Sequence, residues 1–484
     1  MKHTYSLIVS LLMISLLQPV ILMGQSKDPL VDAAANHLKK LAENDHFSGV
    51  VLIAKDGKAI FSKAYGFANL SDSIPNRLDT RFNLASLDKM FTAMAVMQLV
   101  QADKISTDAT VGRYLPNYMN RTVADSVTIH QLLTHTSGMG SFWEEYDKVA
   151  KEKYKTVDDY LPLFVNKPLL LKPGTRYLYS NSGYTLLGKI IEQVSGKTYF
   201  DYVKQHIFLP AKMYDTDALE LDDVLPRIAT GYTMSQEHPG SWKNNTYANV
   251  VKGGPAGGSY ATAADLLRFA NAVVSNSLLN QENTERYIKG KVRYEKGSYA
   301  YGMSTDTING HMIFGHTGGH LGIADELMIC PDLGYTVVIL TNGEVENYWE
   351  ISNFIKSKMF GRSSATDHYF FTKSVIEATV KNGVDAGIKR AGENKDKLEL
   401  REGIIERWAY HNLFDMKNKE ALSLFLLNAR SFPKSSNALY NLAEGYRLTG
   451  NNSEAVAVFE QYLKLEPDDA EVKEKIRILK KASN

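Results

Sequence analysis

The most informative stretch of this chain is Ser86-Leu87-Asp88-Lys89, which opens an apolar run from Met90 to Leu99. The run has the spacing of a helix, and residues i and i+3 of a helix share one face. Ser86 and Lys89 therefore lie side by side at a helix N-terminus, where the helix dipole favours a developing anion. A lysine desolvated in such a place has a lowered pKa and can act as the base that activates the serine. The stretch predicts a serine nucleophile.

Two further motifs follow it along the chain. Residues 171–184 contain Tyr179-Ser180-Asn181, and His316-Thr317-Gly318-Gly319 comes directly after a strand expected at 311–315. S-x-x-K and Y-x-N are weak patterns alone, because both occur elsewhere, S-x-x-K again at Ser431-Phe432-Pro433-Lys434. At that second place the proline breaks the helix, so we interpret the match as chance.

The three motifs in this order resemble those of serine β-lactamases and penicillin-binding proteins, with the class C enzymes and their esterase and D-aminopeptidase relatives nearest. The resemblance covers roughly residues 30–360 and implies a β-lactamase-like α/β fold, an antiparallel sheet flanked by helices plus an inserted all-helical region. The hydrophobic pattern agrees with this fold. Strands are expected at 49–54, at 58–65 and within 311–341, with helical patterns from about 86 to 274 between them.

The resemblance implies a role for each motif residue. Ser86 would be the acylated nucleophile, and Lys89 would be its base or would lower the pKa of its neighbours. Tyr179 would relay protons among nucleophile, leaving group and water. Asn181 would hydrogen-bond the acyl-side amide of the substrate. The backbone N–H groups of Ser86 and Gly319 would form the oxyanion hole, in which one donor is worth about 3–4 kcal/mol in the transition state. The remaining residues expected to bind substrate are His316, Thr317 and Gly318.

One residue departs from the β-lactamase pattern, because His316 stands where those enzymes carry a lysine. Histidine, with a reference pKa near about 6.5, is mostly neutral at pH 7 and offers no permanent charge to a substrate carboxylate. The sequence therefore favours esters, amides or substrates with a D-amino-acid N-terminus over penicillins and peptides that end in D-alanine. We expect a serine hydrolase that cleaves an ester, amide or peptide-like bond. The alternative is a catalytically inactive penicillin-binding-like protein that binds a peptide or protein partner through C-terminal repeats.

Composition excludes several other functions. A net charge of +1 gives no electrostatic case for nucleic acid. A single cysteine, Cys330, permits no intrachain disulfide or cysteine metal cluster, and the twelve histidines show no H-E-x-x-H spacing. The α/β-hydrolase pattern G-x-S-x-G, the P-loop and the dinucleotide fingerprint are absent from the sequence. We therefore expect neither a metal nor a cofactor.

The first 24 residues are typical of a secretory signal peptide. A charged start at Lys2 precedes an apolar run from Leu7 to Leu17, and the small residue Gly24 comes before polar sequence. The run is short for a membrane span, and Pro19 follows it closely. No cysteine lies nearby for lipid attachment. We expect a secreted or periplasmic protein with no stable membrane span after cleavage.

The C-terminal residues repeat with an offset of 34. Three pairs carry the repeat: Ala421 with Ala455, Phe425 with Phe459, and Pro433 with Pro467. The second copy resembles the tetratricopeptide repeat, a helix–turn–helix unit, whereas the first is degenerate, with Met416 where glycine is usual. We interpret these repeats as a structural appendage in preference to a peptide-binding surface. A third possibility is that they restrict access to the catalytic site.

The chain is thus expected to have four parts. They are a signal peptide (1–24), a serine hydrolase domain (25–361), a linker with a helix (362–401), and two tetratricopeptide-like repeats plus a capping helix (402–484). The fold class expected for the whole is α/β followed by an all-α helical-repeat tail.

Overall fold

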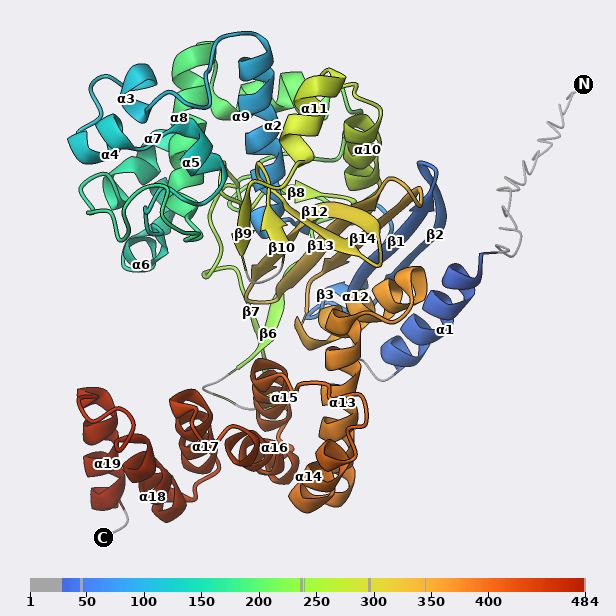
Figure 1. Cartoon of the computed structure of the whole chain (residues 1–484), viewed down its shortest axis with the longest axis vertical. Coiled ribbons are helices and arrows are strands. Elements are labelled where there is room, and N and C mark those ends of the chain that lie inside the picture. The colour runs from blue at the N-terminus through green and yellow to red at the C-terminus, as the bar shows by residue number, and fades with distance from the viewer. Residues whose placement is uncertain are drawn as a thin grey trace, which may run out of the picture.

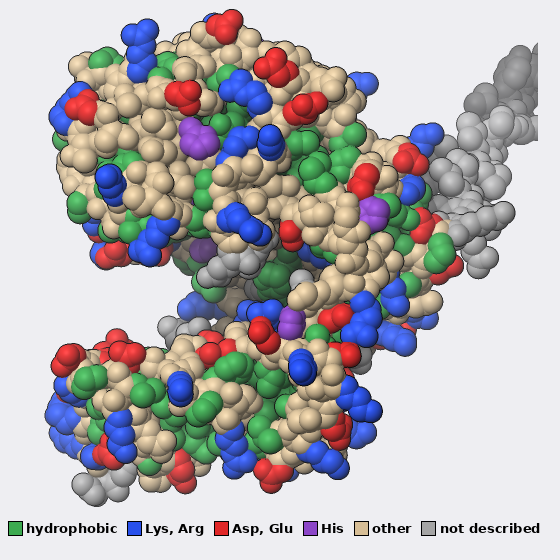
Figure 2. Space-filling model, viewed as in Figure 1, with side chains coloured by type: hydrophobic (Ala, Val, Ile, Leu, Met, Phe, Trp, Pro, Cys, Tyr) green, Lys and Arg blue, Asp and Glu red, His purple; other side chains and the backbone are tan. Residues whose placement is uncertain are grey.

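The computed structural model of the chain describes residues 28–43, 47–235, 238, 240–294, 297–343 and 345–482. The residues expected to form the signal peptide, 1–24, lie outside them. No helix among the described residues combines the length and apolar character needed to cross a membrane. Figure 1 shows a large lobe that holds the sheet and a smaller all-helical lobe below it, and Figure 2 shows the surface hollowed between the two.

One eight-stranded antiparallel sheet organises the large lobe, with the strand order β2-β1-β14-β13-β12-β11-β10-β9. Its strands are β1 (Gly49–Lys55), β2 (Lys58–Tyr65), β9 (Val292–Tyr294), β10 (Gly297–Tyr299), β11 (Ser304–Ile308), β12 (His311–His320), β13 (Ile323–Cys330) and β14 (Tyr335–Thr341). The two ends of the domain meet within this sheet, because β1 pairs with β14. The expected antiparallel arrangement is confirmed.

The sheet differs from expectation at one edge. The short strands β9, β10 and β11 were not predicted, because polar residues and glycine leave them without an apolar alternation. The strand expected at 311–315 continues to His320 and includes the whole H-T-G-G motif. The motif therefore lies within a strand, which holds its backbone in the sheet, and not after the strand as predicted.

Both faces of the sheet are buried. Val50 and Leu52 of β1 join one hydrophobic core, whereas Val51 and Ile53 join another on the opposite face. The period of two along a strand explains this division, and burial of both faces explains why β1 is apolar without interruption. The first core is covered by α2 (Asp88–Gln101) and α10 (Ala263–Val274), the second by α1 (Pro29–Glu43) and α12 (Val345–Phe360).

The expected all-helical region lies beyond α2, at the end of the lobe away from α1 (Figure 1). Its helices are α3 (Val111–Tyr114), α4 (Arg121–Ser126), α5 (Ile129–Leu133), α6 (Trp143–Tyr146), α7 (Val157–Tyr160), α8 (Asn181–Ser195) and α9 (Tyr199–Val203), with α11 (Gln281–Ile288) beside α2. Three two-stranded ribbons complete the lobe: β3 (Phe67–Asn69) with β4 (Ile74–Pro75), β5 (Phe82–Asn83) with β8 (Tyr260–Ala261), and β6 (Tyr232–Met234) with β7 (Trp242–Asn244).

The small lobe has its own hydrophobic core. The segment 362–401, expected to be a linker with one helix, instead forms α13 (Ser364–Asn382) and α14 (Val384–Gly392), which pack on the helices that follow. Those are α15 (Glu402–Phe414), α16 (Asn418–Ser431), α17 (Ser436–Leu448), α18 (Asn452–Tyr462) and α19 (Ala470–Ala482). Two successive helix pairs and a last helix agree with the predicted order of elements, while their assignment to the tetratricopeptide class stays a prediction.

Candidate active site

Ser86 lies on a short 3-10 turn, Ala85–Leu87, that runs directly into α2. Ala85 has φ of 42°, a left-handed conformation that strains a residue with a side chain. The turn brings Ser86 Oγ to 3.1 Å from the Nζ atom of Lys89, which is fully buried. The spacing of three residues thus places hydroxyl and amine together as the sequence predicts.

The described partners of the Lys89 amine are uncharged. Its Nζ atom donates to Oδ1 of Asn181 at 2.8 Å and to the carbonyl oxygen of Ala256 at 2.5 Å. Burial lowers the pKa of Lys89 to about 7, against a smaller opposing effect of the neighbouring Asp88. A lysine with this pKa is partly an uncharged amine at neutral pH and can accept the proton of Ser86.

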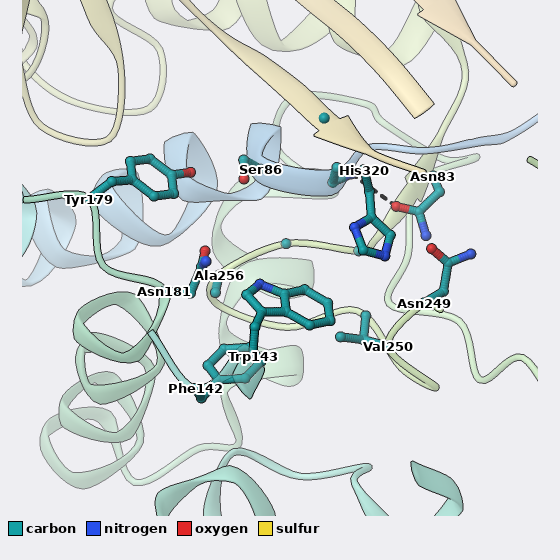
Figure 3. Close-up of a pocket in the computed structure, with 14 residues that line it drawn as sticks. Asn83, Ser86, Phe142, Trp143, Tyr179, Asn181, Asn249, Val250, Ala256 and His320 are labelled. Carbon is teal, nitrogen blue, oxygen red and sulfur yellow. Dashed lines mark hydrogen bonds between the residues drawn. The ribbon is translucent and has the colours of Figure 1, made fainter. Parts of the chain in front are cut away.

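Tyr179 and Asn181 flank the N-cap of α8. Between them, Ser180 accepts the N–H of Gly183 at 2.9 Å, and this cap fixes where the helix begins. The Tyr179 hydroxyl points toward Ser86 (Figure 3), and its ring centroid lies 4.8 Å from Lys89 Nζ. Burial raises the pKa of Tyr179, and a hydrogen bond with Ser86 lowers it by less. The phenol therefore stays protonated near neutrality and can donate.

A cavity of about 160 Å³ opens beside Ser86. Trp143 lies across the cavity from Ser86. Tyr179 lies at one end of the cavity, and Asn83, Asn249 and His320 lie at the opposite end (Figure 3). The Trp143 and His320 rings stack with centroids 5.1 Å apart. None of the 14 described residues that line the cavity is Asp, Glu, Lys or Arg. A substrate in this cavity would meet apolar, aromatic and polar groups.

The H-T-G-G segment approaches Ser86 through its glycines. A Cβ atom on Gly318 would lie 2.4 Å from the carbonyl oxygen of Leu84, so only glycine lets β12 pass this close to the turn that carries Ser86. A Cβ atom on Gly319 would meet open space, and Gly319 is the motif residue that lines the cavity. The described part of β11 pairs with β12 only as far as Gly315, so that edge of residues 316–320 carries no neighbouring strand.

His316 is buried and is not among the described residues that line this cavity, although it lines a second cavity together with Thr317. Its Nδ1 atom is 2.6 Å from the carbonyl oxygen of Thr317, and its Nε2 atom is 3.0 Å from the Tyr299 hydroxyl. Burial, with a smaller effect of the Lys89 charge, lowers the pKa of His316 to about 3. The expectation that this ring is neutral agrees with its surroundings, whereas its expected contact with substrate stays a prediction. Thr317 and Gly318 also lie outside the lining of the cavity beside Ser86.

A chain of hydrogen bonds settles the proton positions on two histidines. The backbone N–H of Ser180 donates to Nδ1 of His135 at 3.0 Å, so the proton of the neutral His135 ring is on Nε2. That proton is donated to the Tyr299 hydroxyl at 3.2 Å. Tyr299 then donates to Nε2 of His316, and His316 donates from Nδ1 to Thr317. With both rings neutral, each group in this chain has a hydrogen-bond partner. The chain links the turn that carries Tyr179 to β12.

Sequence reasoning missed the part that Tyr299 plays, because no motif surrounds it. His135 is a second residue whose part in this chain of hydrogen bonds the motifs do not indicate. His135 has φ of 57°, and its ring centroid lies 4.2 Å from that of Tyr179. Trp143 and His320 carried no signal, since they become neighbours only in the folded chain.

The described residues include no group of three or more His, Cys, Asp or Glu side chains placed to hold a metal ion. Cys330, the lone cysteine, is buried at the end of β13. Burial raises the pKa of the Cys330 thiol to about 12, so it is a poor nucleophile near neutrality.

Comparisons with known proteins agree with this geometry. The family model described as Beta-lactamase matches residues 34–351. Penicillin-binding protein 4* of Bacillus subtilis (strain 168) is 28% identical over 330 residues, 64% of this chain and 71% of the relative. The structure of a penicillin-binding protein from Bacillus halodurans superimposes with a TM-score of 0.61 at 34% identity, covering 66% of this chain and 99% of that one.

A more distant structure shares the fold. The D-amino acid amidase of Ochrobactrum anthropi SV3, complexed with L-phenylalanine amide, has a TM-score of 0.58 at 22% identity and covers 68% of this chain and 98% of its own. The resemblance to serine β-lactamases and penicillin-binding proteins, first drawn from three short motifs, is confirmed by these matches, and so is the fold class.

Proposed function

Because this chain belongs to the β-lactamase family, we propose that it is an active serine hydrolase that forms an acyl-enzyme on Ser86. The observation that carries the proposal is the contact of 3.1 Å between Ser86 Oγ and the buried Nζ atom of Lys89. A base with a pKa near the operating pH combines a useful fraction of free amine with a useful proton affinity.

The reaction follows from where these groups lie. The amine of Lys89 takes the proton of Ser86 while Oγ bonds to the substrate carbonyl carbon and the carbonyl oxygen becomes an anion. The N–H groups of Ser86 and Gly319 hold that anion, in keeping with the place of both residues on the cavity wall. Tyr179 passes the proton to the leaving group as the scissile bond breaks. Water then releases the acid and restores the Ser86 hydroxyl.

The substrate class follows from the absence of charge. None of the described lining residues is Asp, Glu, Lys or Arg, and burial lowers the pKa of the nearby His316 to about 3. A carboxylate or an ammonium group taken into this cavity would lose its water without gaining an ion pair. We therefore favour uncharged esters and amides over penicillins, over peptides that end in D-alanine, and over substrates with a free α-amine.

Two measurements test this function. Intact-protein mass spectrometry after treatment with a fluorophosphonate should show one adduct, which peptide mapping places on Ser86. A hydrolysis screen should rank short p-nitrophenyl esters and N-acylated amides above free D-amino-acid amides and above nitrocefin. An unmodified Ser86 with every acylating probe would contradict the reaction, whereas a faster reaction with the charged substrates would contradict the substrate class alone.

Export is a separate proposal. The signal-like sequence of residues 1–24 supports a secreted or periplasmic location. Expression of the full chain in a bacterium, followed by N-terminal mass mapping of the protein from the periplasm and medium, should find a mature chain that starts near residue 25. Retention of the intact N-terminus in the cytoplasm would contradict export.

A further inference from the structure

One wall of the catalytic cavity is a loop that runs from Asn245 to Val250, whose last two residues line the cavity. The loop is tied to the end of β12 at two points. Asn245 Nδ2 donates to the carbonyl oxygen of Leu321 at 2.7 Å, and His320 Nε2 donates to that of Ala248 at 3.0 Å. His320 also stacks on Trp143. The position of this loop therefore shapes the end of the cavity at Asn249, Val250 and His320.

The loop continues directly from the ribbon of β6 and β7, and that ribbon reaches the small lobe (Figure 1). Near the tip of the ribbon, the Gly240 N–H donates to the carbonyl oxygen of Phe414 at 2.7 Å. Phe414 is the last residue of α15. The Cγ atom of Met416 lies 2.9 Å from the position that a Cβ atom on Gly240 would take. The turn of residues 414–416, called the corner below, thus contacts Gly240. Gly240 begins the segment that continues through β7 into the loop 245–250 at the cavity wall.

Met416 is an unusual residue for this corner. It has φ of 60° and its side chain is exposed at 59%, so it strains the backbone without joining the hydrophobic core. The residue at the same point of the next helix pair, 34 positions later, is Gly450, with φ of 81° and open space where a Cβ atom would be. Glycine satisfies this turn without strain. What Met416 adds is its contact with Gly240.

We propose that the corner of residues 414–416 is a positioning element through which the small lobe holds the cavity wall and sets the substrate preference of the Ser86 site. This inference rests on the proposed serine hydrolase function. The corner touches neither substrate nor reacting atoms. It acts through the ribbon and the loop 245–250, so its loss should change how substrates fit and leave the chemistry at Ser86 and Lys89 in place.

The test uses three full-length variants. Met416→Gly removes the contact and relieves the backbone. Gly240→Ala places a methyl group against Met416 at a position where φ is 83°. Gly450→Ala imposes a similar backbone strain, with φ of 81°, where nothing lies within 4 Å, and is the matched control. Michaelis constants are measured for p-nitrophenyl esters of increasing acyl length, beside the fraction of protein labelled by a fluorophosphonate.

We expect Met416→Gly and Gly240→Ala to raise KM for the longer esters by about three- to tenfold, with kcat and labelled fraction little changed, and Gly450→Ala to match wild type. Hydrogen exchange gives a second measurement that needs no turnover: the amides of residues 241–250 should exchange faster in the first two variants alone. Unchanged exchange and unchanged ester preference in both variants would overturn the inference. Absence of any labelling in the wild type would instead overturn the proposed function and leave the exchange result to decide on the corner.

Discussion

The same four-residue pattern, S-x-x-K, occurs in both lobes with different surroundings. In the large lobe Ser86 lies on a turn that enters α2, and Lys89 is fully buried against Asn181 and Ala256. In the small lobe Ser431 is the last residue of α16, and Lys434 is exposed beyond Pro433. The comparison shows that the four-residue pattern alone does not create a site suited to activating a serine. Such a site also needs the serine at the start of a helix and a buried amine beside it.

The largest expected effect separates the two serines. Ser86→Ala should lower kcat by at least about 10⁴-fold, since no other hydroxyl takes its place beside Lys89, while Ser431→Ala should leave kcat within about twofold of wild type. Turnover of a p-nitrophenyl ester measures both, and circular dichroism confirms that both variants fold. Substantial turnover in Ser86→Ala would mean that another residue is the nucleophile, and that the stretch 86–89 has no more catalytic importance than the stretch 431–434.

Replacement of the two lysines, Lys89 and Lys434, should give the next largest difference in kcat/KM. Lys89→Ala removes the base and should lower kcat/KM by about 10²–10⁴-fold, whereas Lys434→Ala should not change it. The pH profile adds a sign. Lys89 accepts a proton only as the free amine, and its pKa is lowered to about 7, so kcat/KM of the wild type should rise with pH through about 7 and then level off. A profile that falls over that range would contradict Lys89 as the base.

Much of this distinction could be predicted from the sequence. Apolar periodicity located α2 and the strands β1, β2 and β14, and the order of three motifs located Ser86, Lys89, Tyr179 and Asn181. The sequence could not show where residues distant along the chain meet, because no local pattern marks such contacts. His316 carries the motif, but its hydrogen-bond partner Tyr299 lies on β10, a strand too short and polar to be recognised. The hydrogen bond between Gly240 and Phe414 likewise could not be predicted, because it joins the two lobes.

Buried polar side chains in the two lobes differ in their hydrogen bonding, and the free energy of unfolding of suitable variants should show the difference. Tyr299 joins two neutral histidines, so Tyr299→Phe leaves buried nitrogen atoms without a partner and should lower the free energy of unfolding by about 1–3 kcal/mol. Asn428 in the core of the small lobe is buried, and neither side-chain polar atom has a hydrogen-bond partner among the described residues. Asn428→Leu should therefore be neutral or stabilising by about 1 kcal/mol. Urea unfolding of both variants checks the contrast, and a stabilising Tyr299→Phe would show that the chain of hydrogen bonds is not satisfied.

The smallest expected effect concerns the third residue of the S-x-x-K pattern, which is Asp88 in the large lobe and Pro433 in the small lobe. Asp88 is buried, accepts the Ser259 N–H at 2.7 Å, and raises the pKa of Lys89 against the larger effect of burial. Asp88→Asn keeps an acceptor for Ser259 and removes the charge.

The sign of that effect follows from which form of Lys89 the carboxylate favours. An ionised Asp88 stabilises the ammonium, so its loss lowers the pKa of Lys89 and should move the rising limb of kcat/KM toward lower pH. The move should be partial, because burial raises the pKa of Asp88 itself to about 7 and the carboxyl is only partly ionised where Lys89 titrates. Ester hydrolysis from about pH 5 to 9 measures the limb, with the exposed Asp125→Asn as a control that should not shift it. A limb that moves toward higher pH would mean that Asp88 acts on Lys89 through the position of the Ser259 loop and not through its charge.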